Sequence, residues 1–203
     1  MAPKISDEQK EKQREKIRIG AKAVFRRKGY EQTTMKDIRE EAKISTGSLY
    51  MYFATKEEVF LNILEVDMLG ADERMTIDSN SSVWSQINLF IDNYKKHYEY
   101  ICDEIIPIAY EYLMSAWREP SRSEIAMKRY KSATDYFNLL IKEGIDRGEF
   151  KPVIDPSEIS KFIVTISEGL NSISLSLGRE SVDIDEQLNT LKVFLEFSLG
   201  IKK

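Results

Sequence analysis

Apolar residues recur three and four positions apart through most of the chain, which is the spacing of a helix with one buried face. This period predicts two short helices between residues 34 and 53 and seven longer ones, over about 13–28, 55–75, 83–101, 103–119, 121–147, 157–177 and 184–199. Pro107 is expected to kink or restart the fourth of the long helices, and residues 1–12 to form a mobile arm. No stretch of alternating apolar and polar residues is long enough for a strand. The chain is therefore predicted to be all-α, with about nine helices.

The stretch from residue 33 to residue 60 divides into two short helices, a tight turn and the start of a third helix. Hydroxyl residues stand where each helix can begin: Thr34, Ser45 or Thr46, and Thr55. The second short helix would bury Leu49 and Phe53 on one face and show small and hydrogen-bonding side chains on the other. Two short helices of this kind are typical of a helix-turn-helix, whose second helix enters the major groove of DNA.

The order of residues in this stretch, TT…DI…A.IS.G.LY.YF..KEE.F, resembles the tetracycline-repressor (TetR) family of bacterial transcription regulators. The residues that carry the resemblance in register are Ser45, Gly47, Leu49, Tyr50, Phe53, Lys56 and Glu57. The resemblance is dense over Phe25–Phe60, with a weaker echo at Gly148–Phe150. It implies an N-terminal arm and helix-turn-helix domain over 1–56, followed by an effector-binding and dimerisation domain over 57–203. It also implies that the helix 55–75 transmits effector binding to the DNA-binding head.

Two residues depart from the family pattern. Lys43 stands in the turn where glycine is usual, and a left-handed backbone there would cost a lysine about 1 kcal/mol. Arg39 stands where a small alanine is usual. Both substitutions put the turn geometry and the helix packing of this segment in question, although neither removes a residue expected at the DNA.

The resemblance and the helix pattern together predict the residues that contact double-stranded DNA: Thr34, Lys36, Ser45, Thr46, Gly47, Ser48, Tyr50, Met51, Tyr52 and Lys56. The positions of Tyr50 and Lys56 commonly hold phosphates in the family. Residues near the start of the second short helix are candidates for base-edge contact, and Gly47 permits a close approach of the backbone. Charge agrees with this division, because residues 1–60 carry a net charge of +4 whereas residues 61–203 carry −8. A DNA phosphate responds mainly to the nearby charges.

An effector site is predicted among the aromatic residues of the helices between 83 and 147, where the family holds its ligand. The candidates are Tyr94, Tyr98, Tyr110, Glu111, Met114, Trp117, Tyr136 and Phe137. An aromatic stripe at helical spacing is equally compatible with an ordinary core, and Glu111 suits either a lipophilic cation or the solvent. The expected effector is a small molecule of apolar or aromatic character.

The last two helices are apolar on more than one face. In the family the equivalent helices pair with those of a second subunit, which makes these residues candidates for a homodimer interface: Phe162, Ile166, Leu170, Ile173, Leu188, Leu191 and Leu195. The alternative is that these side chains only close the core of a single subunit.

Composition narrows the remaining possibilities. A single cysteine, Cys102, rules out an intrachain disulfide and fits a reducing cytoplasm, and with the single His97 it is too little for a structural zinc site. No apolar run approaches the length of a membrane span, and the N-terminus does not have the pattern of a secretory signal. No phosphate-binding glycine loop or hydrolase motif occurs, so we expect neither an enzyme nor a bound cofactor.

The sequence thus predicts a cytoplasmic, homodimeric, DNA-binding regulator, most simply a repressor that a small molecule releases from an inverted-repeat operator. An activator with the same fold is the nearest variant. A different class of protein, a helical ligand- or protein-binding module with a vestigial helix-turn-helix, is the alternative. The positive head and the presence of Tyr50 and Lys56 favour the regulator.

Overall fold

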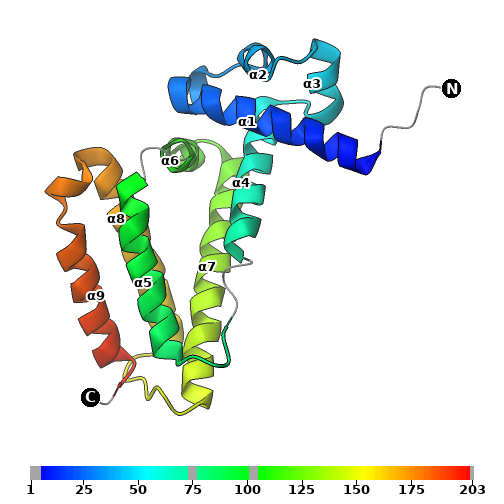
Figure 1. Cartoon of the computed structure of the whole chain (residues 1–203). Helices are drawn as coiled ribbons and strands as arrows, with labels where there is room; N and C mark the ends of the chain where they lie inside the picture. The colour runs from blue at the N-terminus through cyan, green and yellow to red at the C-terminus, as the bar shows by residue number, and fades with distance from the viewer. Residues whose placement is uncertain (1–5, 73–76, 101–104, 202–203) are drawn as a thin grey trace. The chain divides into compact units, whose positions relative to one another are not determined.

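The structure is a computed structural model that describes residues 6–72, 77–100 and 105–201. Within those residues all regular structure is helical, as predicted, with nine α-helices and two short 3₁₀ helices, η1 and η2 (Figure 1). Their bounds are α1 Asp7–Gln32, α2 Met35–Glu41, α3 Thr46–Tyr52, α4 Lys56–Asp72, α5 Val83–Tyr100, α6 Ile106–Met114, η1 Ser115–Trp117, α7 Pro120–Asp146, α8 Pro156–Leu177, η2 Arg179–Ser181 and α9 Ile184–Ser198.

The helices form two compact units. The first contains α1–α4 together with α6, and the second contains α5, η1, α7, α8, η2 and α9. The boundary expected from the sequence, after residue 56, falls at the first residue of α4, which the first unit keeps as a whole. Helix α6 also joins the first unit, although the chain reaches it only after α5.

The first unit is built around the buried stripe of α1, formed by Ile17, Ala21, Val24 and Phe25. Helices α2 and α4 pack on α1, and α6 packs on its C-terminal end. Gly20 lies within this stripe because α2 ends against it: a Cβ at residue 20 would lie 2.8 Å from the backbone nitrogen of Ala42. A glycine that weakens α1 thus permits the close contact between α1 and α2.

Helix α1 differs from its prediction at both ends. It begins at Asp7 because Ser6 forms a capping box with Gln9, in which each side chain bonds the backbone N–H of the other residue at 3.1–3.2 Å. The expectation that residues 1–12 form a mobile arm is therefore wrong for residues 7–12, and residues 1–5 lie outside the described part. Near its C-terminus the helix is interrupted at Gly29, whose φ of +77° and ψ of 171° are not helical.

The turn between α2 and α3 places Lys43 at a φ of +51°, in the left-handed region. This is the conformation for which glycine is favoured, so the departure from the family pattern has the expected backbone consequence. Arg39 does not disturb the packing of α2. Its half-exposed guanidinium bonds the Thr46 hydroxyl at 3.2 Å and the Glu40 carboxylate at 2.8 Å, and so links α2 to the first residue of α3.

Helix α6 begins at Ile106, next to the proline at which a kink or restart was predicted, and residues 103 and 104 of the predicted helix lie outside the described part. Pro107 is the second residue of α6, where its missing N–H costs no helical hydrogen bond. The rest of the predicted 103–119 helix is divided, since α6 ends at Met114 and η1 follows.

In the second unit α7 packs against α8, and α9 lies beside α5 and α8 (Figure 1). The Gly148–Phe150 segment joins these elements. The Glu149 carboxylate accepts the N–H groups of Val83 and Trp84 at the start of α5, with its shortest bond at 2.8 Å. The Phe150 ring lies over Gly144, where an added Cβ would be 2.2 Å from the ring. These contacts give the segment a structural role at the end of the bundle.

Replacing Lys43 with glycine is expected to raise the free energy of unfolding by about 1 kcal/mol, because glycine adopts the left-handed backbone without the cost of a Cβ. Chemical denaturation followed by circular dichroism measures the change. Lys36→Gly is the matched control, since Lys36 is an exposed lysine in the helical backbone of α2 and its replacement should lower stability by up to about 1 kcal/mol. Equal losses in both variants would show that the turn carries no strain at Lys43.

Candidate DNA-binding and effector sites

Helix α3 is fixed by its cap and by two buried side chains. The Ser45 hydroxyl accepts the Ser48 N–H at 3.1 Å and so caps the N-terminus, as predicted. Leu49 and Phe53 are buried against the rest of the first unit. The opposite face of this seven-residue helix is turned mainly to solvent, and the Thr46 hydroxyl on it accepts a bond from Arg39.

The outward face of α3 contains most of the residues predicted to contact DNA. Tyr50 and Met51 are 53% and 70% exposed, and Thr46 and Gly47 are also exposed. A Cβ built at Gly47 would meet nothing within 4 Å, so no contact inside the protein requires a glycine there. Ser48 and Tyr52 are half-buried at the edge of this face.

The start of α2 carries two further predicted DNA contacts, Thr34 and Lys36, both of them exposed. Thr34 caps the helix, and the Asp37 carboxylate in return accepts its N–H at 3.0 Å and its hydroxyl at 2.7 Å. The Lys28 ammonium, 2.7 Å from the Asp37 carboxylate, and the Thr34 bonds hold the pKa of Asp37 at about 2. An anion at this helix start would therefore have to compete with a carboxylate that the protein itself supplies.

Lys56 has partners within the protein. Its ammonium donates to the carbonyl oxygens of Tyr30 at 2.8 Å and Glu31 at 2.9 Å, and it lies 4.6 Å from the centroid of the Tyr30 ring. The lysine thus bonds two carbonyl groups in the last turn of α1, where the Tyr30 carbonyl also accepts the Thr33 N–H at 3.3 Å. Its expected contact with a DNA phosphate stays a prediction.

Helix α6 is joined to the first unit by two polar side chains that are adjacent in sequence. The Glu111 carboxylate accepts the N–H groups of Tyr30 at 3.0 Å and Glu31 at 3.2 Å. The Tyr112 hydroxyl donates to the Glu57 carboxylate at 2.5 Å, near the start of α4. The Tyr112 ring is fully buried, edge-on to Tyr30 with centroids 4.9 Å apart. The carboxylate predicted for a cationic effector is therefore engaged with the backbone of α1.

Four of the eight predicted effector residues come together in the second unit. Tyr94 and Tyr98 on α5 have ring centroids 5.6 Å apart, and Tyr136 and Phe137 on α7 have centroids 5.3 Å apart. Phe90, which the prediction missed, connects the pairs, because its ring lies 5.3 Å from Tyr94 and 5.0 Å from Phe137. We call these five residues the aromatic cluster. Burial raises the pKa of Tyr136.

The other four candidates belong to α6 and η1. Tyr110, Glu111 and Met114 belong to α6 in the first unit. Trp117 is 76% exposed, and the Arg118 guanidinium carbon lies 4.4 Å from the centroid of its ring. The sequence placed all eight together because they fall within one span of the chain, whereas the fold assigns α6 to a different unit from α5 and α7.

Tyr94 also has polar partners on α8, which the sequence reading missed. The Asn171 side-chain amide donates to the Tyr94 hydroxyl at 3.0 Å. Burial and the nearby Glu168 carboxylate raise the pKa of Tyr94 to about 12, so the hydroxyl keeps its proton. A signal for this contact was present in the sequence, since α8 carries polar residues in its buried stripe at helical spacing, namely Ser160, Ser167, Asn171 and Ser174.

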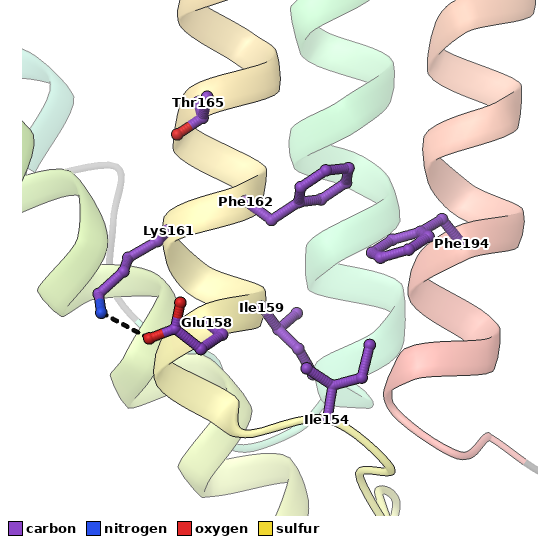
Figure 2. Close-up of a pocket in the computed structure, with 7 residues that line it drawn as sticks. All are labelled: Ile154, Glu158, Ile159, Lys161, Phe162, Thr165 and Phe194. Carbon is purple, nitrogen blue, oxygen red and sulfur yellow. Dashed lines mark hydrogen bonds and ion pairs between the residues drawn. The ribbon is translucent and has the colours of Figure 1, made fainter.

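Helices α8 and α9 share an apolar face that this subunit leaves open. Ile173 and Phe197 are 46% and 71% exposed, and Leu177 and Val193 are exposed as well. A groove of about 330 Å³ lies at one end of this face (Figure 2). In the groove the rings of Phe162 from α8 and Phe194 from α9 face each other, with centroids 4.5 Å apart.

The residues predicted for the dimer interface divide between this face and the core. Phe162 and Ile173 lie on the open face, and Ile166 is half-buried. The four leucines are at most 6% exposed, so they close the subunit's own core and a partner could not reach them in this conformation: Leu170, Leu188, Leu191 and Leu195. Their burial argues against these four as interface residues, and the open face also holds Leu177, Val193 and Phe197, which the prediction did not include.

Comparisons with known proteins agree with the resemblance seen in the sequence. Residues 17–63 match the model of the bacterial regulatory proteins of the tetR family, and residues 86–185 match that of a tetracyclin repressor-like C-terminal domain. The HTH-type transcriptional regulator YfiR of Bacillus subtilis is 36% identical over 200 residues, which is 97% of this chain and 96% of YfiR. The HTH-type transcriptional repressor KstR2 of Mycobacterium tuberculosis is 29% identical over 148 residues, 70% of this chain and 72% of KstR2.

Solved structures share the fold at lower sequence identity. A TetR transcription regulator from Haloarcula marismortui superposes with a TM-score of 0.76 at 20% identity, over 95% of this chain and 100% of that one. Salmonella enterica GusR gives a TM-score of 0.71 at 19% identity, over 97% and 98% of the two chains. In the part of the chain that the structure describes, no helix is both long and apolar enough to cross a membrane.

Replacing Glu111 with glutamine is expected to lower the free energy of unfolding by about 1 kcal/mol. The amide has one acceptor oxygen instead of two, and its NH₂ group would face the N–H of Tyr30 or Glu31. Chemical denaturation measures the loss, and Glu65→Gln, at an exposed glutamate of α4, is the control that should change little. Equal stability of the two variants would show that the two bonds contribute nothing to the first unit.

Proposed function

Because the chain belongs to the tetracycline-repressor family of bacterial regulatory proteins, we propose that it represses transcription from an inverted-repeat operator and leaves the DNA when a small molecule binds. The observation that carries the DNA-binding part is the outward face of α3. It is exposed and rich in hydrogen-bonding groups, while Leu49 and Phe53 on the other face are buried. A face of that kind fits the major groove, where side chains at the start of the helix meet base edges.

Selection of random duplex DNA by the purified protein tests this part of the proposal. An enriched inverted repeat, with an affinity that falls steeply as salt rises, is the expected result. Enrichment of no sequence would instead favour the alternative, a helical binding module whose helix-turn-helix does not read DNA. A reporter gene placed behind the selected duplex then distinguishes a repressor from an activator.

Gly47→Ala separates a role in DNA binding from a role in folding. Alanine at this position meets no atom within 4 Å and favours the helix, so stability without DNA should rise by up to about 1 kcal/mol. Affinity for the selected duplex should fall about 10-fold or more, since the new methyl group stands where the DNA would approach the backbone. Gel shift and thermal melting on the same sample measure the two effects. An unchanged affinity would exclude close contact of α3 with DNA at Gly47.

The open face of α8 and α9 supports a homodimer. An exposed apolar face of this extent is typical of a protein–protein interface, and a twofold dimer would read two half-sites about 34–36 Å apart or multiples of that distance. Gly169 lies on the same face of α8 with nothing within 4 Å of a built Cβ, so a second helix could approach closely there. Association through this face would cover Phe197 and Ile173.

Ile173→Arg is expected to convert the dimer to a monomer, because it places a charge within the proposed interface. The fold of the subunit should be kept, since Ile173 is already exposed in it. Analytical ultracentrifugation measures the mass in solution. Leu89→Arg is the control, at a leucine that is 59% exposed on α5 and outside the α8–α9 face. Loss of the dimer in both variants, or in neither, would contradict the assignment of this face.

The aromatic cluster supports an effector site in the second unit, because small-molecule sites are lined mainly by apolar and aromatic side chains with a few polar groups. In this proposal α6 transmits the effect of the bound molecule to the DNA-binding helices. The chain leaves the second unit after α5 and returns to it at η1, so α6 is joined at both ends to helices of that unit. Glu111 and Tyr112 tie α6 to α1 and α4. In the proposed mechanism the effector displaces the ends of α6, and the helices that carry α3 follow.

A further inference from the structure

Helix α8 buries a line of polar side chains that face the interior of the second unit. Ser160, Ser167, Asn171 and Ser174 are each at most 8% exposed, and their spacing of seven, four and three residues places them along one side of the helix. Ser160 has ordinary partners, because its hydroxyl lies 2.9 Å from both the Pro156 carbonyl and the Asn138 side chain. Asn171 and Ser174, at the other end of the line, lack such partners for one atom each.

Asn171 and Ser174 each bury an atom without a partner. The Asn171 side-chain oxygen and the Ser174 hydroxyl have no hydrogen bond to any of the described residues, and both residues are only 2% exposed. They are three positions apart on a helix, so the two atoms belong to neighbouring turns of one face. Buried polar atoms are nearly always hydrogen-bonded, because leaving one unpaired forfeits its bonds to water. Folding alone would favour an apolar side chain in place of Ser174, and it makes no use of the Asn171 oxygen.

Asn171 lies beside the aromatic cluster. The Asn171 amide nitrogen is held by the Tyr94 hydroxyl at 3.0 Å, which fixes the side chain next to a ring of the cluster. The charges nearby are already paired, since Arg129 contacts the Glu168 carboxylate at 3.2 Å. Around Tyr94 the described residues therefore offer aromatic surface and uncharged hydrogen-bonding groups beside one ion pair.

We propose that Asn171 and Ser174 form the polar end of the effector site, and that the effector is a small aromatic molecule with an uncharged hydroxyl group. A hydroxyl satisfies both residues at once, because it donates to the amide oxygen and accepts from the serine hydroxyl. The aromatic part of the effector then packs among Phe90, Tyr94 and Phe137, which must shift to admit it. This inference rests on the proposed effector-released function and specifies the ligand for it.

Calorimetric binding of paired probes to the full chain, without DNA and near neutral pH, tests the ligand chemistry. The pairs are phenol with toluene and 2-naphthol with 2-methylnaphthalene, which match in size and differ in the hydroxyl group. The hydroxylated member of at least one pair should bind about 10-fold tighter or more, as expected for a site built to bond a hydroxyl. The proposal is wrong if neither hydroxylated probe binds, or if both members of each pair bind equally.

The variant Ser174→Ala distinguishes a serine that binds the effector from a serine with only a structural role. The melting temperature should rise, because an unpaired buried hydroxyl is removed, while the preference for the hydroxylated probe should fall several-fold. Ser176→Ala on the same helix is the matched control, since the exposed Ser176 hydroxyl donates to the Ser172 carbonyl at 2.8 Å and should affect neither quantity. Asn171→Leu gives a second variant, in which the preference for the hydroxylated probe should be lost.

If both variants keep the preference of the original protein, the two atoms bond an internal water or nothing, and the proposal is overturned. The DNA-binding function is measured separately, by adding 2-naphthol to the complex with the selected duplex. Release of DNA supports both the subsite and the proposed function. Tight binding of 2-naphthol without release supports the subsite and contradicts effector release by this class of molecule. Release by other molecules, with no preference between the paired probes, supports the function and overturns the subsite.

Discussion

Two side chains bond the backbone of Tyr30 and Glu31, which directly follow the break in α1 at Gly29. The Glu111 carboxylate takes both N–H groups, and the Lys56 ammonium donates to both carbonyls. A carboxylate from α6 and an ammonium group from α4 thus bond the backbone at a single break in α1. The chain runs from this point into α2 and α3, so the position of the helix-turn-helix depends on these four bonds.

The sequence predicted the local features of this region and missed the distant ones. Thr34 and Ser45 cap their helices through bonds to residues only three positions away, and such pairs are visible in any short stretch of sequence. Glu111 is 80 residues from Glu31, and no periodicity relates them. The aromatic neighbours of Glu111 in the sequence suggested an effector site, whereas the contact that matters is to a helix end that only the fold brings near.

A similar limit applies to the two C-terminal helices. Their period shows that each has more than one apolar face, but the period is the same whether a face is closed by the chain itself or by a partner. Leu195 and Phe197 are two residues apart on α9, yet one is fully buried and the other is 71% exposed. Which apolar residue lies inside depends on how α9 packs against α5 and α8, and that information resides in the tertiary structure.

Residues whose type does not suit their local backbone or their burial locate the candidate sites better than motifs do. Gly47 weakens a short helix without serving any internal contact, and Asn171 buries an oxygen that nothing within the described chain bonds. Folding uses neither the glycine at position 47 nor the Asn171 oxygen, so a ligand that reaches each of them is the more economical explanation. Lys43 shows where this reasoning stops. Its left-handed backbone also opposes local preference, but it follows from the tight turn itself and identifies no ligand. A disagreement points to function when the turn or the packing does not already require it. Gly47 meets that condition, and so does the oxygen of Asn171, whose amide nitrogen alone is used by the fold.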